Sequence, residues 1–176
     1  MSRIPRVMAV SAALFLALST NARAQFGVGQ KYLGAHVGLS GVGSAAALGV
    51  NGEVAYNENI GIGAWFDTWS YGYDYSGLGG GNWSLRYVAI AGTGAYHFPI
   101  ASNPRLDPFL GLALGYYVVS SSWEGGGVSI DYAGDANRLF VGGFGGARYS
   151  FNDNVSGVAR LGFGASYLTV GVDFKL

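Results

Sequence analysis

The chain has 176 residues, ten Lys and Arg against ten Asp and Glu, and no cysteine; half of its residues are hydrophobic and 11% are charged. The lack of cysteine excludes a disulfide scaffold and a cysteine metal site. The hydrophobic fraction argues against a disordered chain, and the balanced charge gives no reason to expect nucleic-acid binding. The charged fraction is far below the ordinary value of about 25%, which is unusual for a water-soluble domain.

Residues 1–24 have the pattern of a secretory signal peptide. Two arginines precede an apolar run at residues 7–18, and small residues at 22–24 fit a cleavage site. The apolar run has about 12 residues, short of the roughly 20 of a membrane-spanning helix, so an uncleaved anchor is the less favoured alternative. We therefore expect a mature chain of residues 25–176, with a net charge of −3 because three arginines are removed.

The expected mature chain is poor in helix signals. No apolar stretch after residue 24 approaches the 18 residues of a helical membrane span, and all 31 glycines lie in this part of the chain. Because glycine inside a helix costs about 1 kcal/mol relative to alanine, we expect almost no helix.

Period-two alternation of apolar and polar or small residues is the dominant pattern. In the last segment Leu168, Val170, Val172, Phe174 and Leu176 share one face, opposite Thr169, Gly171, Asp173 and Lys175. Such alternation is typical of a β-strand with two different faces. It predicts eight strands, in chain order 32–40, 48–56, 60–71, 86–98, 109–120, 139–151, 155–163 and 168–176.

Eight alternating strands fit either a soluble barrel or a membrane barrel, and the composition of the second face decides between them. A soluble barrel turns its polar face to water, and that face should be rich in Lys and Glu. Here the face opposite the apolar stripe is mostly Gly, Ala, Ser, Thr and aromatic residues. The sequence therefore predicts an all-β, eight-stranded, antiparallel up-and-down transmembrane β-barrel whose apolar face contacts lipid.

A few charged residues lie on the small-residue face, which is predicted to line the lumen. Unpaired charges in a narrow lumen would cost several kcal/mol each, so we expect ion pairs, with Arg160 near Asp173 and Glu53 near the basic residues. The alternative is a set of separate solvated charges. The predicted lumen charges are Glu53, Asp67, Arg148, Arg160, Asp173 and Lys175, with Trp65, Trp69, Phe140 and Phe144 filling the remaining space.

Connection lengths predict the orientation. Turns at 57–59 and 152–154 and the connection 99–108 lie on the side of the termini, and short connections are typical of the periplasmic side. The opposite side has loops at 41–47, 72–83, 121–137 and 164–166. Aromatic residues favour recognition by these loops, and an upper aromatic girdle is an equally supported interpretation. The predicted recognition residues are Tyr71, Tyr73, Tyr75, Trp83 and Trp123.

The signal peptide, the eight alternating strands and the closing residues 169–176 resemble the small outer-membrane β-barrels of the OmpX and OmpA-barrel type, often grouped as porin-family barrels. The segments 93–98 and 146–149 are also similar to strand ends of that family. The resemblance implies that the last strand is recognised by the barrel assembly machinery. Its assembly signal would comprise Thr169, Gly171, Phe174 and Leu176, where leucine replaces the commoner aromatic last residue.

Catalytic residues are scarce. The only histidines are His36 and His97. Neither is followed two residues later by serine, as in the His-x-Ser pattern of barrel deacylases. A palmitoyltransferase barrel would add an N-terminal amphipathic helix, for which residues 25–30 are too few. We therefore expect no enzyme activity, no cofactor and no metal site.

These observations predict a non-enzymatic barrel in the outer membrane of a Gram-negative bacterium, which contributes to envelope structure and presents aromatic and acidic loops for interaction or adhesion. The expected partners are outer-membrane lipids and lipopolysaccharide, the assembly machinery, and an extracellular ligand or host surface, with no nucleic acid. The first alternative is a narrow porin or carrier for small or hydrophobic solutes. The second is a lipid A-modifying barrel enzyme.

Overall fold

The computed structural model describes residues 26–41, 45–74, 81–125, 128–133 and 137–176. Within these ranges no helix has the length and apolarity needed to cross a membrane. The same ranges contain strands β1 (Lys31–Ser40), β2 (Ala46–Ala55), β3 (Ile60–Asp74), β4 (Gly81–His97), β5 (Leu106–Gly125), β6 (Val128–Ala133), β7 (Arg138–Ser150), β8 (Val155–Phe163) and β9 (Ser166–Lys175).

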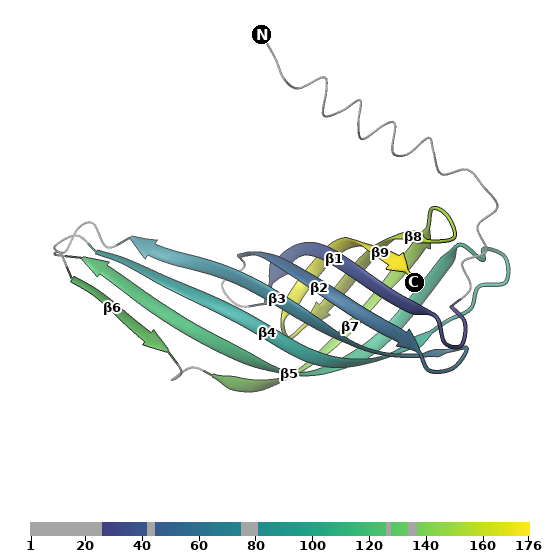
Figure 1. The fold of residues 1–176 in the computed structure, drawn as a ribbon, viewed down its shortest axis with the longest axis horizontal. Coiled ribbons are helices and arrows are strands. Elements are labelled where there is room, and N and C mark those ends of the chain that lie inside the picture. Colours follow the sequence, from purple (N-terminus) through teal and green to yellow (C-terminus); the bar gives the residue numbers. More distant parts are fainter. Residues whose placement is uncertain (1–25, 42–44, 75–80, 126–127, 134–136) are drawn as a thin grey trace, which may run out of the picture.

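Eight of these strands close into one barrel (Figure 1). Each strand pairs antiparallel with its neighbour in the order β1-β2-β3-β4-β5-β7-β8-β9, and β9 pairs with β1 to complete the circle. The remaining strand, β6, pairs with β5 beyond the barrel wall. The predicted eight-stranded antiparallel barrel is therefore confirmed. The predicted signal peptide, residues 1–24, lies outside the described residues.

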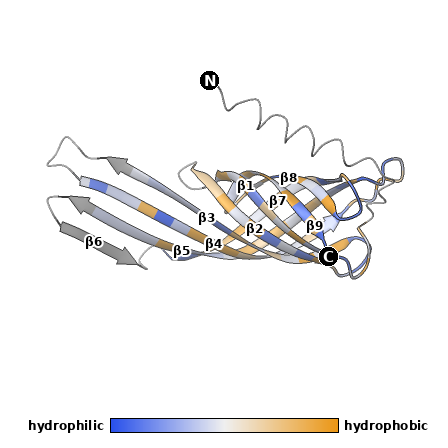
Figure 2. Cartoon of the chain, turned by 45° about the horizontal axis from the view of Figure 1, so that its top comes forward, coloured by the Kyte–Doolittle hydropathy of each residue, from blue (hydrophilic) through white to orange (hydrophobic). Residues whose placement is uncertain are grey.

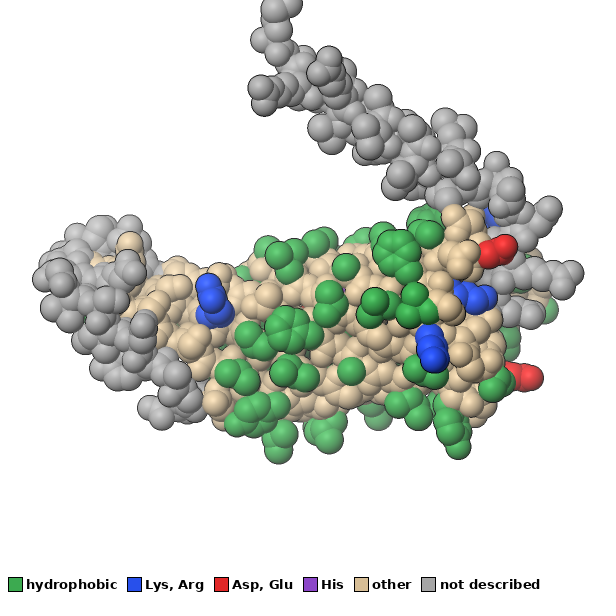
Figure 3. All heavy atoms as spheres, viewed as in Figure 1, with side chains coloured by type: hydrophobic (Ala, Val, Ile, Leu, Met, Phe, Trp, Pro, Cys, Tyr) green, Lys and Arg blue, Asp and Glu red, His purple; other side chains and the backbone are tan. Residues whose placement is uncertain are grey.

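The alternation determines which side of each strand faces outward. Apolar side chains such as Leu114, which is 63% exposed, stand on the outer surface. In Figure 2 the barrel strands alternate between hydrophobic and hydrophilic residues, and Figure 3 shows hydrophobic side chains over the middle of one face with charged ones toward its ends. This surface is an apolar belt around a closed sheet, which has no open edge within the belt.

Small and aromatic side chains fill the interior. Ala89, Ala91 and Ala113 are buried there beside Phe109 and Phe144. Glycine allows the closest approaches between strands. At Gly49 an added Cβ would overlap the Asp67 carboxylate and the His36 ring, so only glycine leaves room for that pair.

The predicted loops at 72–83 and 121–137 are wrong in part. β3 continues to Asp74, β4 begins at Gly81, and β5 runs to Gly125 before β6 turns back along it. These segments form the extension, defined as residues 69–74, 81–87, 119–125 and 128–133, which projects past the other strands in Figure 1. Sequence reasoning missed it because the outward residues of these segments are polar or small, so the end of the apolar stripe was read as the end of each strand.

The start of β5 also differs from the prediction. The strand begins at Leu106, and Asp107 and Pro108 are in register with Arg148 and Ala147 of β7. The backbone N–H of Phe98 donates to the carbonyl of Pro108 at 2.8 Å, which holds the strand start against the end of β4. Asp107 thereby becomes a residue of the barrel wall, and it faces inward as Phe109, two residues further along the strand, does.

Candidate functional site

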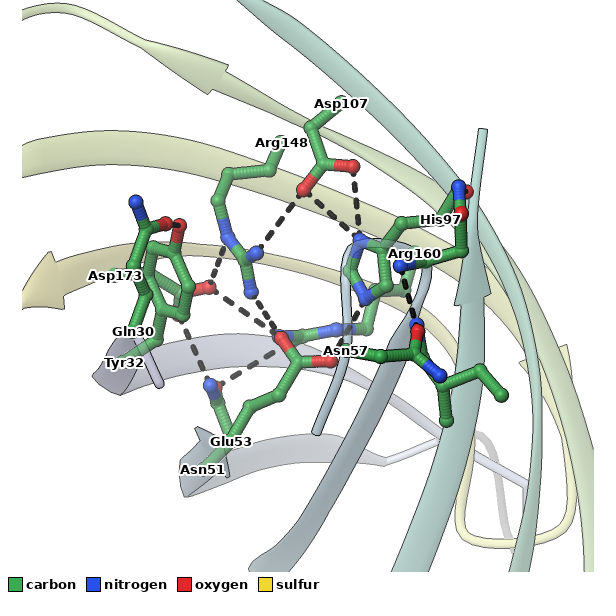
Figure 4. A network of polar contacts seen from close by, with 12 residues as sticks. Gln30, Tyr32, Asn51, Glu53, Asn57, His97, Asp107, Arg148, Arg160 and Asp173 are labelled. Atoms are coloured by element: carbon green, nitrogen blue, oxygen red, sulfur yellow. Dashed lines mark hydrogen bonds and ion pairs between the residues drawn. The ribbon is translucent and has the colours of Figure 1, made fainter. Parts of the chain in front are cut away.

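Arg148 of β7 is the hub of a network of polar contacts inside the barrel (Figure 4). Its side chain is 3% exposed and donates three hydrogen bonds to carboxylates on three other strands. Nη2 donates to Glu53 Oε2 at 2.6 Å, Nη1 to Asp107 Oδ2 at 3.1 Å, and Nε to Asp173 Oδ2 at 3.0 Å. One guanidinium thus links β2, β5 and β9 across the lumen.

Arg160 and Asn51 extend this cluster. The Arg160 Nη2 atom lies 3.7 Å from Asp173 Oδ2, and its Nη1 donates to Asn51 Oδ1 at 3.4 Å. The amide nitrogen of Asn51 donates to Asp173 Oδ1 at 3.0 Å. Both oxygens of this fully buried carboxylate are therefore satisfied, as a buried charge requires.

His97 of β4 lies between two carboxylates at the terminal end of the barrel, the end that carries the chain's C-terminus. Its Nδ1 lies 2.8 Å from Asp107 Oδ1, and its Nε2 lies 2.9 Å from Glu53 Oε1. The ring of Phe26 stacks on the imidazole with centroids 3.6 Å apart. The segment before β1 therefore covers His97 from the mouth of the barrel.

His36 of β1 connects the cluster to the other half of the lumen. Its Nε2 lies 2.6 Å from Asp67 Oδ1, and its Nδ1 lies 3.1 Å from Asn51 Oδ1. Ser166, at the start of β9, donates to Asp67 Oδ2 at 3.3 Å. These hydrogen bonds and ion pairs join ten residues inside the barrel, which we call the lumen network. Its members are His36, Asn51, Glu53, Asp67, His97, Asp107, Arg148, Arg160, Ser166 and Asp173.

Small cavities lie inside the barrel, among the residues that the structure describes. Two internal cavities of about 20 Å³ each lie on either side of Trp65, and each has room for about one water molecule. A larger pocket of about 580 Å³ lies at the terminal mouth, where Phe26 and His97 form part of its wall. The network and the aromatic side chains thus occupy the middle of the lumen.

Five of the six lumen charges named from the sequence belong to the lumen network: Glu53, Asp67, Arg148, Arg160 and Asp173. Lys175, by contrast, is half-buried at the terminal end of β9 and is not one of the network's members. The sequence analysis missed Asp107, because it placed this residue in a connection, and it missed Asn51 and the roles of both histidines. The available signal was parity, since Asp107 lies two residues before the inward Phe109, and Asn51 two residues before the inward Glu53, so each pair shares a face.

The four residues of the predicted assembly signal lie on β9 and at the chain's end. Thr169 is buried on the inner side, whereas Phe174 and Leu176 are exposed on the outer side. Gly171 lies so close to His36 of β1 that an added Cβ would come within 2.6 Å of the His36 Cβ. β9 is therefore the strand whose pairing with β1 closes the barrel.

The outer face of β3, β4 and β5 changes polarity where the barrel passes into the extension. In the barrel the outward residues Phe66, Ile90 and Tyr116 are apolar, whereas Ser70, Arg86 and Ser120, four residues further along each strand, are polar and exposed. The inner face carries aromatic residues in both parts, with Trp65 and Tyr117 in the barrel. The rings of Trp69 and Tyr87 stack with centroids 5.3 Å apart, and those of Tyr71 and Tyr87 at 5.8 Å.

The predicted recognition residues lie mostly in strands and not in loops. Tyr71 and Tyr73 belong to β3, Trp83 to β4 and Trp123 to β5, while Tyr75 lies outside the described residues. Trp83 and Trp123 are register partners. Four of the five residues are therefore positioned by the hydrogen-bonded ladder of the extension, which a loop would not provide.

A closed eight-stranded sheet with an apolar belt outside and a satisfied polar network inside is the fold of a small transmembrane β-barrel. No protein-family model and no curated protein sequence matches the chain. Several solved structures of this fold, in contrast, are similar to the chain.

The N-terminal β-barrel domain of Pseudomonas aeruginosa OprF is similar with a TM-score of 0.58 and 15% identity, covering 85% of this chain and 99% of that domain. Ail, the attachment invasion locus protein of Yersinia pestis, in complex with the heparin analogue sucrose octasulfate, gives 0.58 at 11% identity, covering 85% and 99%. Neisserial surface protein A gives 0.53 at 17% identity, covering 84% and 95%. At these identities the comparison shows a shared fold.

Proposed function

We propose that the protein is a non-enzymatic barrel of a Gram-negative outer membrane that contributes to envelope structure and presents its extension outside the cell for interaction or adhesion. The change in polarity of the outer face between the barrel and the extension carries this proposal. An apolar outer face is stable only against acyl chains, and a face of serines and an arginine is stable against water. The boundary between the two faces lies near Thr68, Val88 and Val118.

Spin labels test this assignment directly. Labels at Leu112, Val141 and Val170 are expected to report acyl chains, and a label at Ser84 of the extension is expected to report water. The measurement is the accessibility of each label to oxygen and to a water-soluble relaxation agent in reconstituted bilayers. Water contact at the first three positions would refute the membrane assignment.

The filled lumen supports a structural role over a porin role. Eight strands leave an interior just wide enough for side chains, and here the lumen network crosses it. We expect negligible conductance in planar bilayers. Steady single-channel steps from the purified protein would instead support the narrow pore or carrier for small or hydrophobic solutes.

The partners of both histidines argue against a lipid A-modifying enzyme. A serine nucleophile needs a histidine nitrogen within hydrogen-bond reach as its base. The ring nitrogens of His97 both face carboxylates, and those of His36 face Asp67 and Asn51. We expect unchanged lipid A mass spectra after expression.

The extension supports the interaction role, because it holds aromatic side chains on a rigid ladder outside the apolar belt. Gly72 and Ser84 are register partners, so replacing residues 73–83 with Asn-Gly should join β3 and β4 by a tight turn without disturbing the barrel. We expect this variant to keep its heat-modifiable gel migration and to lose binding of outer-membrane vesicles to cultured epithelial cells. Retained binding would contradict the assignment of interaction to this part of the extension.

Outer-membrane lipids, lipopolysaccharide and the barrel assembly machinery are the proposed partners during and after insertion. The outward position of Phe174 and Leu176 on the closing strand supports recognition of this strand by assembly factors. An unpaired amphipathic edge can add to another sheet until closure removes the edge. Substituting Phe174 by Ser should reduce the amount of barrel assembled in cells, measured by gel migration, more than the same change at exposed Phe98.

A further inference from the structure

We propose that the barrel interior contains a binding site for one ordered water molecule, held by the indole N–H of Trp65 and the hydroxyl of Thr169. The site is a cavity of about 20 Å³ that both residues line, and we call it the Trp65 water site. The proposal goes beyond the proposed function, because it depends neither on what the extension binds nor on whether the protein acts as an adhesin.

Trp65 and Thr169 each carry a polar atom in the interior that no protein atom satisfies. Trp65 Nε1 and Thr169 Oγ1 are shielded from solvent, and neither has a hydrogen-bond partner among the residues that the structure describes. Thr169 as a whole is only 7% exposed. A buried N–H or O–H without a partner is costly, so nearly all such groups in proteins bond to protein or to ordered water. The two atoms therefore point to a small polar ligand.

The size of the cavity fits one water molecule. A buried water needs about 10–15 Å³, and the cavity has about 20 Å³, which leaves no room for a larger solute. A second cavity of about 20 Å³ lies on the other side of Trp65, but Thr93 lines it in place of Thr169. The first cavity is therefore the one in which both unpartnered atoms can meet the same molecule.

Other polar groups in the wall supply further hydrogen bonds. A buried water molecule makes about three of them. Asp67, Arg160 and Ser166 line the cavity together with Trp65 and Thr169. The hydroxyl of Ser166 donates to Asp67 Oδ2 at 3.3 Å, which is a long contact, and Arg160 is the register partner of Thr169 on β8. The wall thus offers both donors and acceptors, so one water molecule finds the partners that it needs.

The composition of the wall favours water over other occupants of so small a space. Cavities that stay dry are lined by apolar groups, whereas polar side chains make up most of this wall. The carboxylate of Asp67 disfavours an anion such as chloride, and the guanidinium of Arg160 disfavours a metal cation. The polar lining residues are His36, Trp65, Asp67, Arg160, Ser166 and Thr169, and the others are Phe144, Leu161 and Gly162.

NMR cross-relaxation between water and the indole protons tests the proposal. The chain has four tryptophans, so a protein labelled with nitrogen-15 at the indole gives four signals, and Trp65→Phe assigns one of them while keeping an aromatic ring. We expect the Trp65 indole proton of the reconstituted protein to show a water peak. Opposite signs of this peak in the laboratory and rotating frames identify a bound water, and equal signs identify exchange with solvent. No peak, or an exchange peak alone, would overturn the proposal.

Matched threonine variants test the place of the site. Thr169→Val keeps the shape of the side chain and removes the hydroxyl, so we expect the Trp65 water peak to lose most of its intensity. Thr93→Val makes the same change in the second cavity and should leave the peak unchanged, as should Thr169→Ser, which keeps the hydroxyl. If Thr169→Val does not fold, Ser166→Ala removes the other hydroxyl of the same cavity and should weaken the peak. An unchanged peak in the folded variant would refute the assignment to this cavity.

A high-resolution crystal structure gives a second, direct measurement. We expect one density peak in the cavity, at about 2.7–3.2 Å from both Trp65 Nε1 and Thr169 Oγ1. This measurement also separates a water molecule from a hydroxyl proton of Thr169 or Ser166 that exchanges with solvent, because such a proton adds no density of its own. A cavity without density in the wild-type protein would contradict the proposal.

Discussion

Three long strands, β3, β4 and β5, run from the barrel into the extension, but only the barrel has an apolar outer face. In the barrel they point Phe66, Ile90 and Tyr116 outward. Four residues further along, the outward residues Ser70, Arg86 and Ser120 are polar. The backbone ladder is continuous through the change. Alternation therefore identifies the two faces of a strand, and the surrounding medium, lipid or water, decides whether its outer face is apolar.

The two regions also differ in what their inner faces contact. In the barrel the other five strands close the wall, so inner side chains meet across a lumen and can form a charge network. Beyond Trp69 these strands have ended, and Tyr71 and Tyr87 stack along the sheet itself. Long-range polar contacts are therefore a property of the closed part, and local ring stacking is a property of the open part.

The largest expected effect is the loss of the central cation of the barrel. Arg148→Met leaves Glu53, Asp107 and Asp173 without their shared guanidinium, and breaking such a buried pair costs about 3–5 kcal/mol. Urea unfolding in detergent, followed by gel migration, should show this loss. The matched change in the extension, Arg86→Met at an exposed position, should stay within about 0.5 kcal/mol. Equal losses of unfolding free energy for Arg148→Met and Arg86→Met would contradict the proposed difference between the barrel and the extension.

The second prediction tests the two outer faces with the same introduced residue. Leu114→Arg places a charge in the middle of the apolar belt and should destabilise the barrel in bilayers by about 2–4 kcal/mol. Ser84→Arg, on the outer face of the extension, should cost little because this face meets water. Unfolding titrations in lipid vesicles measure the free energy of unfolding of the two variants. A well-tolerated Leu114→Arg would mean that the belt does not contact acyl chains.

The third prediction compares two glycines of the barrel wall. An added Cβ at Gly49 would overlap the His36–Asp67 pair, whereas one at Gly94 meets nothing within 4 Å. Overpacking of this kind costs about 1–3 kcal/mol, so Gly49→Ala should lower the unfolding midpoint and Gly94→Ala should not. The same urea titration measures both. An unchanged midpoint for Gly49→Ala would show that the inner wall can expand.

The smallest expected effect on the barrel comes from the extension. Trp123→Ala removes a half-buried ring far from the lumen network, so barrel unfolding should change by no more than about 0.5 kcal/mol. Local opening should increase, because the ring that lies against Gly81 of β4 is lost there. Hydrogen exchange should speed up at residues 119–125 and stay unchanged at 109–115. Faster exchange in both segments would indicate that barrel and extension unfold together.

Much of the barrel is predictable from the sequence, because strict alternation identifies each strand and its outward face. Leu168 to Lys175 is the clearest case, since every second residue is apolar and the strand was placed to within two residues. The extension was not predictable by this reasoning. Its strands lack an apolar stripe on the outer face, so Tyr71, Trp83 and Trp123 resemble loop residues in the sequence.

The charged residues of the lumen were partly predictable. Parity alone puts Arg148 and Glu53 on the inner face, although they are 95 residues apart in the chain and pair at 2.6 Å. Parity does not give the partners, because partner choice depends on barrel register and on the depth of each residue along the axis. Asp107 was missed for a local reason, since the prolines around it suggested a connection.

The sequence by itself determined the class of fold, the face of each barrel strand that is apolar, and the residues available to fill the interior, because these follow from a period of two and from side-chain chemistry. Only the tertiary structure decided which carboxylate meets which cation, that both histidines lie among acceptors, and where the extension begins. Those features depend on the closure of β9 onto β1 and on strand register, which join residues that no local pattern connects.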